Sequence, residues 1–253
     1  MSGWPRRSVA AVGRAGWLLV HGAHGIVSDT VEQDRLAGDR LAGAFERLGW
    51  RPIATLALLG LMIGLASGIA AARTLHSFYA ERLVEPLVSR VLARDVVPLL
   101  IGVFAAGRVA VETAVRFGAM RLGSELDALR ITGHDPVRYV MAPALAAVVM
   151  ATPLQLVTVF ACAWLGFAVV LDLSVVTSMP VLVHTALTVQ TFRALLWGLA
   201  KTLVYNVGAL VVGALAGLDE HRGIAALGRE ATHAFTGGLL LVIAIGVFSV
   251  LIQ

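Results

Sequence analysis

Long apolar runs separated by short charged segments dominate the pattern of hydrophobic and polar positions along this chain. Residues 52–72 carry no charge, and at about 1.5 Å per helical residue they reach about 31 Å, close to the thickness of a bilayer's hydrocarbon core. Four comparable stretches follow. The pattern predicts five membrane-spanning helices, at about 52–74, 90–117, 138–171, 190–218 and 231–252.

Two of these stretches carry glycine or proline at informative places. Gly60, Gly64 and Gly68 share one face of the first span, where the backbone of a neighbouring helix, in this chain or in a second subunit, could approach closely. The stretch 139–171 contains two prolines but no polar turn. We therefore expect one long, kinked helix there instead of two.

The region before the first span has the pattern of helices that lie in the membrane interface. In residues 34–50, apolar positions recur at near-helical spacing opposite charged ones, and residues 9–27 are apolar apart from an interrupting arginine and histidines. These interruptions argue against a signal peptide. We predict an all-α integral membrane protein, with interfacial (elbow) helices in residues 1–51 and a transmembrane domain in residues 52–253.

A charged segment between the second and third spans has the pattern of a short helix at 124–133. Ser124 and Asp127 have the spacing of a capping box, which would start the helix at Glu125. A glycine can end it in a left-handed conformation, and an Asp-Pro pair can start the next helix. Such a helix is too short to span a bilayer but can contact another protein at the membrane face. The expected contact residues are Glu125, Leu126, Asp127, Leu129, Arg130, Gly133, Asp135 and Pro136.

Composition supports the membrane assignment. The chain is 58% hydrophobic and 14% charged, a balance that a soluble domain would not sustain. Its 20 basic residues, all arginine except Lys201, flank the apolar runs instead of forming one stripe, so no nucleic-acid site is predicted.

The distribution of arginine also predicts the topology. Basic residues are concentrated in 1–51, 116–138 and 219–230 and are sparser in the segments between them. The positive-inside rule then places the N-terminus and the short helix in the cytoplasm and the C-terminus outside. We expect an irregular outer loop at 173–189 and a polar inner loop from Asp219 to Glu230.

The charged segment resembles a known family. The run Glu125-Leu-Asp-Ala-Leu-Arg-Ile-Thr-Gly-His-Asp-Pro-Val-Arg-Tyr, with Ala106-Gly107-Arg108 before it, is similar to the MlaE/YrbE family, the permease subunits of MCE-type ABC lipid transporters. Arg94-Asp95-Val-Val-Pro98 resembles the family's Arg-Glu-Leu-Gly-Pro, with Asp95 in place of the usual Glu. The likeness covers nearly the whole chain. Arg130 and Ala144 depart from the common pattern, which could reflect a different ATPase or an unlike permease partner.

The resemblance implies an assembly in the bacterial inner membrane. Two permeases, identical or related, would form a dimer with a lipid pocket that includes Arg94, Asp95 and Lys201. Two cytoplasmic ATPases, which would bind ATP and Mg, would contact the helix 124–133, and a ring of MCE proteins would lie on the outer side. This chain has no P-loop, no nucleophile and base arranged for catalysis, and no metal-ligand spacing. It is thus expected to be a permease without enzymatic activity, cofactor or metal of its own.

Charged residues inside the spans carry the remaining hypotheses. A lysine at a span centre costs about 2.5 kcal/mol or more, so Lys201 is expected to face protein, water or a partner. Counted inward from Arg193 and Pro86, Lys201 and Asp95 lie about 12 and 13 Å deep, so they could meet. With Arg94 they could receive a lipid headgroup. A purely structural ion pair explains the same residues equally well.

Two alternatives concern the same charges. Arg108, Glu112 and Arg116 are spaced by four and predict a charge ladder on one helix face, with a structural network favoured over a substrate contact. An ion-coupled secondary transporter would use Asp95, Glu112 and Lys201 as a relay. Five spans show no evident pair of inverted repeats, which argues against that function.

Overall fold

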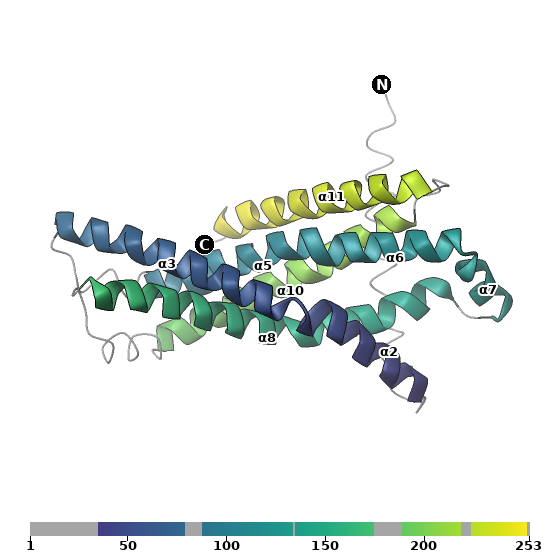
Figure 1. Cartoon of the computed structure of the whole chain (residues 1–253), viewed down its shortest axis with the longest axis horizontal. Coiled ribbons are helices and arrows are strands. Elements are labelled where there is room, and N and C mark those ends of the chain that lie inside the picture. The colour runs from purple at the N-terminus through teal and green to yellow at the C-terminus, as the bar shows by residue number, and fades with distance from the viewer. Residues whose placement is uncertain (1–34, 79–87, 134, 175–188, 219–223, 252–253) are drawn as a thin grey trace, which may run out of the picture. The chain divides into compact units, whose positions relative to one another are not determined.

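The computed structural model describes residues 35–78, 88–133, 135–174, 189–218 and 224–251, and every regular element in these ranges is a helix (Figure 1). Five helices are long and apolar enough to cross a membrane, which confirms the all-α, five-span prediction. Residues 9–27 and nearly all of the expected loop 173–189 lie outside the described residues. The candidate spans are Gly38–Arg73, Val88–Leu122, Pro136–Leu173, Phe192–Gly217 and Leu227–Ser249.

Three of the described elements are five-residue π-helical segments within longer helical runs. The run from η2 through α6 is unbroken, so the second span extends to Leu122, beyond its predicted end. The stretch with two prolines is one helix, α8, as expected. The elements are α2 (Arg35–Phe45), η1 (Glu46–Trp50), α3 (Ile53–Phe78), η2 (Leu92–Val96), α5 (Val97–Ala105), η3 (Ala106–Ala110), α6 (Val111–Leu122), α7 (Glu125–Ile131), α8 (Pro136–Leu173), α10 (Val189–Gly217) and α11 (Ile224–Leu251).

The chain divides into two compact units, to which α5, α8 and α10 each contribute residues on both sides of the division. Unit 1 contains Met1–Trp50, Gly102–Ala151 and Tyr205–Gln253. Unit 2 contains Arg51–Ile101 and Thr152–Val204.

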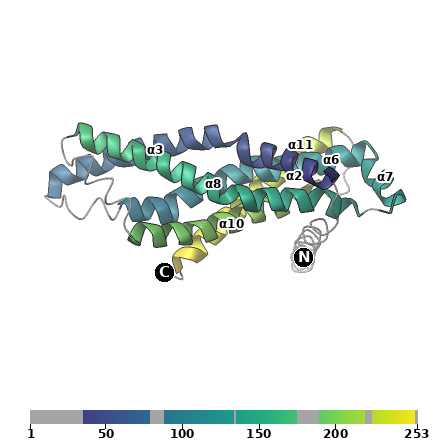
Figure 2. The same ribbon diagram turned by 90° about the horizontal axis from the view of Figure 1, so that it is seen from below.

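In unit 2, α3 lies against the second half of α8 (Figures 1 and 2). Gly64 faces the backbone of Ala163 so closely that a Cβ at position 64 would overlap the Ala163 carbonyl. A Cβ at Gly60 would come within 2.7 Å of the Val159 carbonyl oxygen. The glycine face predicted from the sequence therefore serves helix packing within this chain, where close backbone approach supplies the dispersion contacts that hold membrane helices together.

In unit 1, α11 lies along α6 and η3 (Figure 1). The core beneath them is filled by fully buried side chains such as Phe117, Met141 and Leu210. Gly213 of α10 faces the backbone of Ala110, which repeats the small-residue packing of unit 2.

The segment 35–50, predicted to be helical, forms α2 and η1. Its buried residues include Ala44 and Leu48, and the latter belongs to the core of unit 1. The position of this helix in the membrane interface stays a prediction.

The prediction of a loop that reaches Glu230 is wrong, because α11 begins at Ile224. Ala225, Ala226 and Leu227 are strong helix formers and extend the helix toward the N-terminal side. The polar residues Arg229 and Glu230 therefore belong to the first turns of α11, and the burial of Glu230 reflects the ion pair described below.

Candidate functional site

Arg94 and Asp95 lie in the π-helical segment η2, whose Val97 N–H donates to the Leu92 carbonyl five residues back. Pro98 has no N–H to donate to the Arg94 carbonyl, and its ring would clash with that carbonyl in a regular α-helix. The π turn relieves this conflict. Such turns occur preferentially at functional sites.

Gly198 of α10 allows that helix to approach η2 closely. A Cβ at this position would overlap the Ala93 carbonyl and come within 3.2 Å of Pro98 Cγ. Because of this close approach, the next turn of α10, which carries Lys201, lies beside Asp95.

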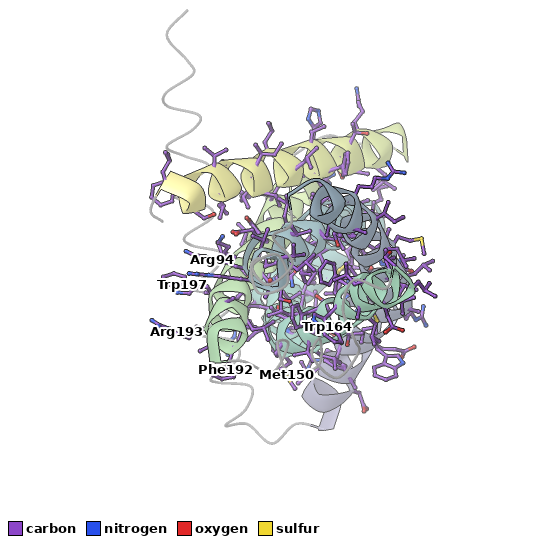
Figure 3. The ribbon with its side chains drawn as sticks, turned by 90° about the vertical axis from the view of Figure 1, so that its left-hand side faces the viewer. Arg94, Met150, Trp164, Phe192, Arg193 and Trp197 are labelled. Atoms are coloured by element: carbon purple, nitrogen blue, oxygen red, sulfur yellow. The ribbon has the colours of Figure 1, made fainter. Side chains whose placement is uncertain are left out.

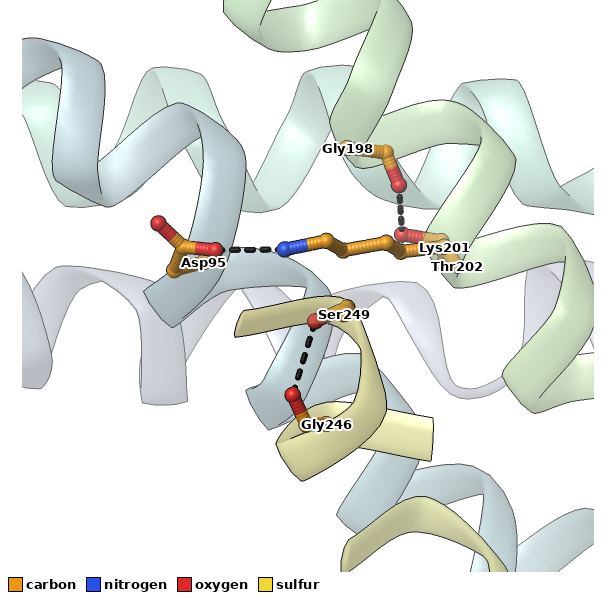
Figure 4. Close-up of polar contacts among 6 residues, drawn as sticks. All are labelled: Asp95, Gly198, Lys201, Thr202, Gly246 and Ser249. Atoms are coloured by element: carbon orange, nitrogen blue, oxygen red, sulfur yellow. Dashed lines mark hydrogen bonds and ion pairs between the residues drawn. The ribbon is translucent and has the colours of Figure 1, made fainter. Parts of the chain in front are cut away.

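Lys201 and Asp95 form an ion pair, as their predicted depths suggested. Lys201 Nζ donates to Asp95 Oδ1 at 2.5 Å (Figure 4). The Lys201 side chain is 10% exposed and that of Asp95 38% exposed, so the carboxylate remains accessible from one side. The adjacent Thr202 is fully buried, and its hydroxyl donates to the Gly198 carbonyl at 2.7 Å. Thr202 thus bonds within its own helix, whereas Lys201 reaches across to η2.

Arg94 does not take part in the Lys201–Asp95 ion pair. Its side chain extends toward the same side of the molecule as Arg193 and Trp197, and these residues line a common cavity together with Arg90 (Figure 3). Its Nε is buried and has no hydrogen-bond partner in the described part of the chain. The structure thus separates the three residues expected at one pocket into an ion pair and a neighbouring arginine.

The short helix between the second and third spans forms as α7, and it begins at Glu125 as predicted. The prediction of a capping box is wrong: Ser124 adopts a left-handed conformation with φ 57°, and its side chain makes no capping hydrogen bond. A backbone turn starts the helix instead, in which Ser124 N–H donates to the Arg121 carbonyl at 3.2 Å. This turn reverses the chain too tightly for Ser124 to take the extended conformation of an ordinary N-cap.

The end of α7 and the start of α8 agree with the sequence. Gly133 has φ 81°, a left-handed conformation that favours glycine. Asp135 Oδ1 accepts a hydrogen bond from the Val137 N–H at 2.9 Å, and Pro136 is the first residue of α8. The predicted cap and first-turn proline are thus both present.

One face of α7 is exposed and mostly charged. Leu126 packs into the protein, whereas Glu125, Asp127 and Arg130 are exposed. Ile131 leaves 87% of its surface uncovered, which is unusual for a large apolar side chain at the end of an ordered helix. The Asp127–Arg130 ion pair, at 3.1 Å, lies on the same exposed surface.

Sequence reasoning missed a buried connection beside α7. Arg121, at the end of α6, donates through Nη2 to Glu230 Oε1 of α11 and through Nη1 to the Gly217 carbonyl at the end of α10, at 3.1 Å. The Glu230 side chain is 4% exposed. The helix-forming residues of segment 224–230 were the signal from which Glu230 could have been predicted to lie in the helix and not in the loop.

The predicted charge ladder forms in part. Glu112 Oε2 lies 3.8 Å from Arg108 Nε, and its other carboxylate oxygen lies 3.5 Å from Nε of Arg47 in η1. Arg116 makes no ion pair within 4.0 Å in the described part of unit 1, because Glu112 turns toward the other two arginines. Glu112 therefore links α6 to the N-terminal helix, a contact that spacing along one helix could not predict.

The buried connection predicts a large difference between two arginines. Arg121→Ala would leave Glu230 charged and buried without its partner, which typically costs about 3–5 kcal/mol. Arg130→Ala, the matched control, removes an exposed pair worth about 0–1 kcal/mol. Thermal unfolding of the purified protein in detergent should show a much lower midpoint for Arg121→Ala. Equal midpoints for the two variants would contradict the structural role of Arg121.

Comparison with known proteins identifies the family. The sequence model described as Permease MlaE matches residues 42–252. The chain is 27% identical to the "Probable ABC transporter permease protein" of Synechocystis sp. over 96% of this chain and 89% of that relative. It is 30% identical to the "Intermembrane phospholipid transport system permease protein MlaE" of Haemophilus influenzae over 56% of this chain and 53% of that relative. It is also 22% identical to the chloroplast protein TRIGALACTOSYLDIACYLGLYCEROL 1 of Arabidopsis thaliana, over 77% and 56% of the two chains. With five apolar helices among its described residues and a family match over residues 42–252, this multi-pass membrane protein belongs to the MlaE permease family.

Proposed function

We propose that this chain is the permease subunit of an ABC transporter that moves phospholipid or related lipids between the inner membrane and the outer side of a bacterial cell envelope. The family match over residues 42–252 carries the proposal. Two relatives support it by their names: one is a probable ABC transporter permease, and the other is the permease of an intermembrane phospholipid transport system. A separate cytoplasmic ATPase, with its own ATP and Mg, would drive the cycle.

The exposed face of α7 supports contact with that ATPase. A seven-residue helix that buries Leu126 and exposes Ile131 together with three charged side chains has the anatomy of an interface: an apolar contact inside a polar rim. Helix α7 follows α6 through a tight, hydrogen-bonded turn at Ser124. A push on α7 would therefore reach α6 directly.

The Arg121 connection supports a route for the movement within unit 1. Because Arg121 binds Glu230 of α11 and the carbonyl of Gly217 in α10, a displacement of the end of α6 would act on both helices. Rigid helices that share a buried ion pair move together. In this proposal ATP binding by the partner moves α7, and the helices bound to α6 move with it.

The Lys201–Asp95 pair supports a polar position within the lipid path of unit 2. The carboxylate is partly accessible, and a lysine that exchanges its carboxylate for a lipid phosphate loses no charge compensation. We propose that Lys201 binds the headgroup when the pair opens.

The remaining partners and the orientation follow from the family and from arginine distribution. We propose a dimer with an identical or related permease, an MCE protein ring on the outer side, and an N-terminus and α7 in the cytoplasm. The C-terminus would then lie on the outer side.

Purification and transport test this function together. The chain, isolated in mild detergent, should bring with it an ATPase, an MCE-domain protein and phospholipid, all identified by mass spectrometry. Lipid movement in vesicles that contain the complex should stop when the ATP-binding lysine of the ATPase is replaced. Transport that persists without ATP hydrolysis and follows an ion gradient would refute the proposal and favour a secondary transporter.

The contact of α7 with the ATPase can be tested by cross-linking. A photoreactive residue in place of Ile131 should cross-link to the ATPase, because this side chain is 87% exposed at the end of α7. The matched control is Leu251 of α11, which is 78% exposed but lies at the proposed outer end of its helix. Equal yields from both positions, or none from position 131, would contradict the proposed contact and topology.

Variants of the ion pair separate a headgroup role from a structural one. Lys201→Ala should reduce both co-purified lipid and transport by about tenfold or more, since hydrogen bonds to charged groups contribute about 1.5–3 kcal/mol. The double swap Asp95→Lys with Lys201→Asp should restore thermal stability but not transport, because the cation then lies on the wrong helix. Full recovery of transport by the swap, or normal lipid content in Lys201→Ala, would leave only a structural pair.

A further inference from the structure

A cavity of about 250 Å³ lies in unit 2 beside the start of two candidate spans. Its lining contains three arginines, Arg90, Arg94 and Arg193, together with Ala194 and Trp197. At about 30 Å³ per water molecule, the volume corresponds to about eight waters, enough for a phosphate group and its ester linkage. None of the described residues that line it is acidic.

The three arginines are uncompensated in the described part of the chain. None of them makes an ion pair or side-chain hydrogen bond with another described residue: Arg90 and Arg193 are exposed, and Arg94 is partly buried. Arg94 keeps its Nε buried without an acceptor. Three cations that line one cavity repel each other and create a positive potential there, which favours an anionic ligand.

A second hollow adjoins the first and is lined mainly by apolar side chains. Its volume is about 210 Å³, and it is lined by Arg193, Leu196 and Trp197, so the two hollows share Arg193 and Trp197. Leu196 and Trp197 are more than half exposed. Positions 192, 193, 196 and 197 follow one face of α10, so this face combines a guanidinium with exposed apolar side chains.

The position along the helices suits the membrane surface. Arg193 is the second residue of the span Phe192–Gly217, and Arg90 is the third residue of the span Val88–Leu122. Arginine and tryptophan at span ends are typical of the headgroup region, where a polar group and an apolar surface meet. Figure 3 shows Arg94, Arg193 and Trp197 extending to the same side of the molecule.

We propose that Arg90, Arg94 and Arg193 form a binding site for a lipid whose headgroup carries about two negative charges, such as a phosphomonoester, with its acyl chain along Leu196 and Trp197. A phosphomonoester has a second ionisation near pH 6 and offers three acceptor oxygens, which match planar arginine donors. A zwitterionic headgroup would bring its own cation into a cavity that already holds three. The site is distinct from the Lys201–Asp95 pair and would select the lipid class before the lipid reaches that pair.

Binding measurements on the purified full chain in nonionic detergent test the site. The probes are dioleoyl phosphatidic acid, a phosphomonoester, and dioleoyl phosphatidylcholine, which has the same acyl chains and a zwitterionic headgroup. We expect the wild-type chain to bind phosphatidic acid about tenfold more tightly, with a preference that shrinks at high salt. Arg90→Gln with Arg193→Gln should lower the affinity for phosphatidic acid about tenfold and change that for phosphatidylcholine less than twofold.

Three controls make the result specific. Arg229→Gln, at an exposed arginine of α11, should bind both lipids as the wild type does. Arg90→Lys with Arg193→Lys, which keeps the charge, should retain most of the preference. Should the double glutamine variant aggregate, Arg193→Gln alone, at an exposed position, should show a smaller loss of the same sign.

Other ligands of the same chemistry give different outcomes. If a hundredfold excess of inorganic phosphate displaces phosphatidic acid completely, the site binds a free anion and the lipid assignment is wrong. Equal affinity of wild type and double variant for phosphatidic acid would also overturn the proposal. Loss of an outer partner protein from that same variant would then assign the arginines to a protein interface.

This inference rests on the proposed lipid transport but fails separately from it. The binding assay needs neither ATP nor a partner subunit. Selective binding without ATP-driven lipid movement would refute the transport function and keep the site, whereas ATP-driven movement without headgroup preference would refute the site alone.

Discussion

Close backbone contact between helices is the constraint on which this structure depends. In a bilayer, apolar side chains gain little by leaving lipid for protein, so helices associate through tight packing of small residues. Gly64 against Ala163 does this in unit 2, and Gly213 against Ala110 does it in unit 1. The contact of Gly198 with Ala93 has a chemical result as well, because it brings Lys201 within hydrogen-bond distance of Asp95.

Charge compensation distinguishes the structural positions from the binding position. Glu230 is almost completely buried and accepts a hydrogen bond from Arg121 through Oε1, and Arg121, which also donates to the Gly217 carbonyl, connects three helices. Lys201 is buried but its partner is partly accessible, which suits a contact that opens. The arginine cavity lacks an acidic partner among the described residues, which is the basis for the anionic ligand proposed there. The membrane makes these differences large, because an uncompensated charge is more costly there than in water.

Much of the fold could be predicted from the sequence because apolar length decides which helices span a bilayer. The Lys201–Asp95 pair could be predicted for a similar reason, since depth follows from counting along two helices. The cavity could not, because it depends on how α10 is rotated against η2, and no spacing within one helix contains that angle. The role of Glu230 was missed because this polar residue, next to a loop, was assigned to the loop. The conformation of Ser124 was missed because backbone hydrogen bonds to α6 set the tight turn that prevents it from capping the helix.

The π turn at η2 has a consequence for the orientation of everything before it. A π turn accommodates one residue more than an α turn, and one residue corresponds to about 100° of rotation. If residues 92–96 were wound as an ordinary α-helix, the residues before η2, Arg90 among them, would turn by about 100° around the axis relative to the helix after Val96. Pro98, which has no backbone N–H to donate, thus favours a turn that sets the direction of a guanidinium about two turns earlier in the helix.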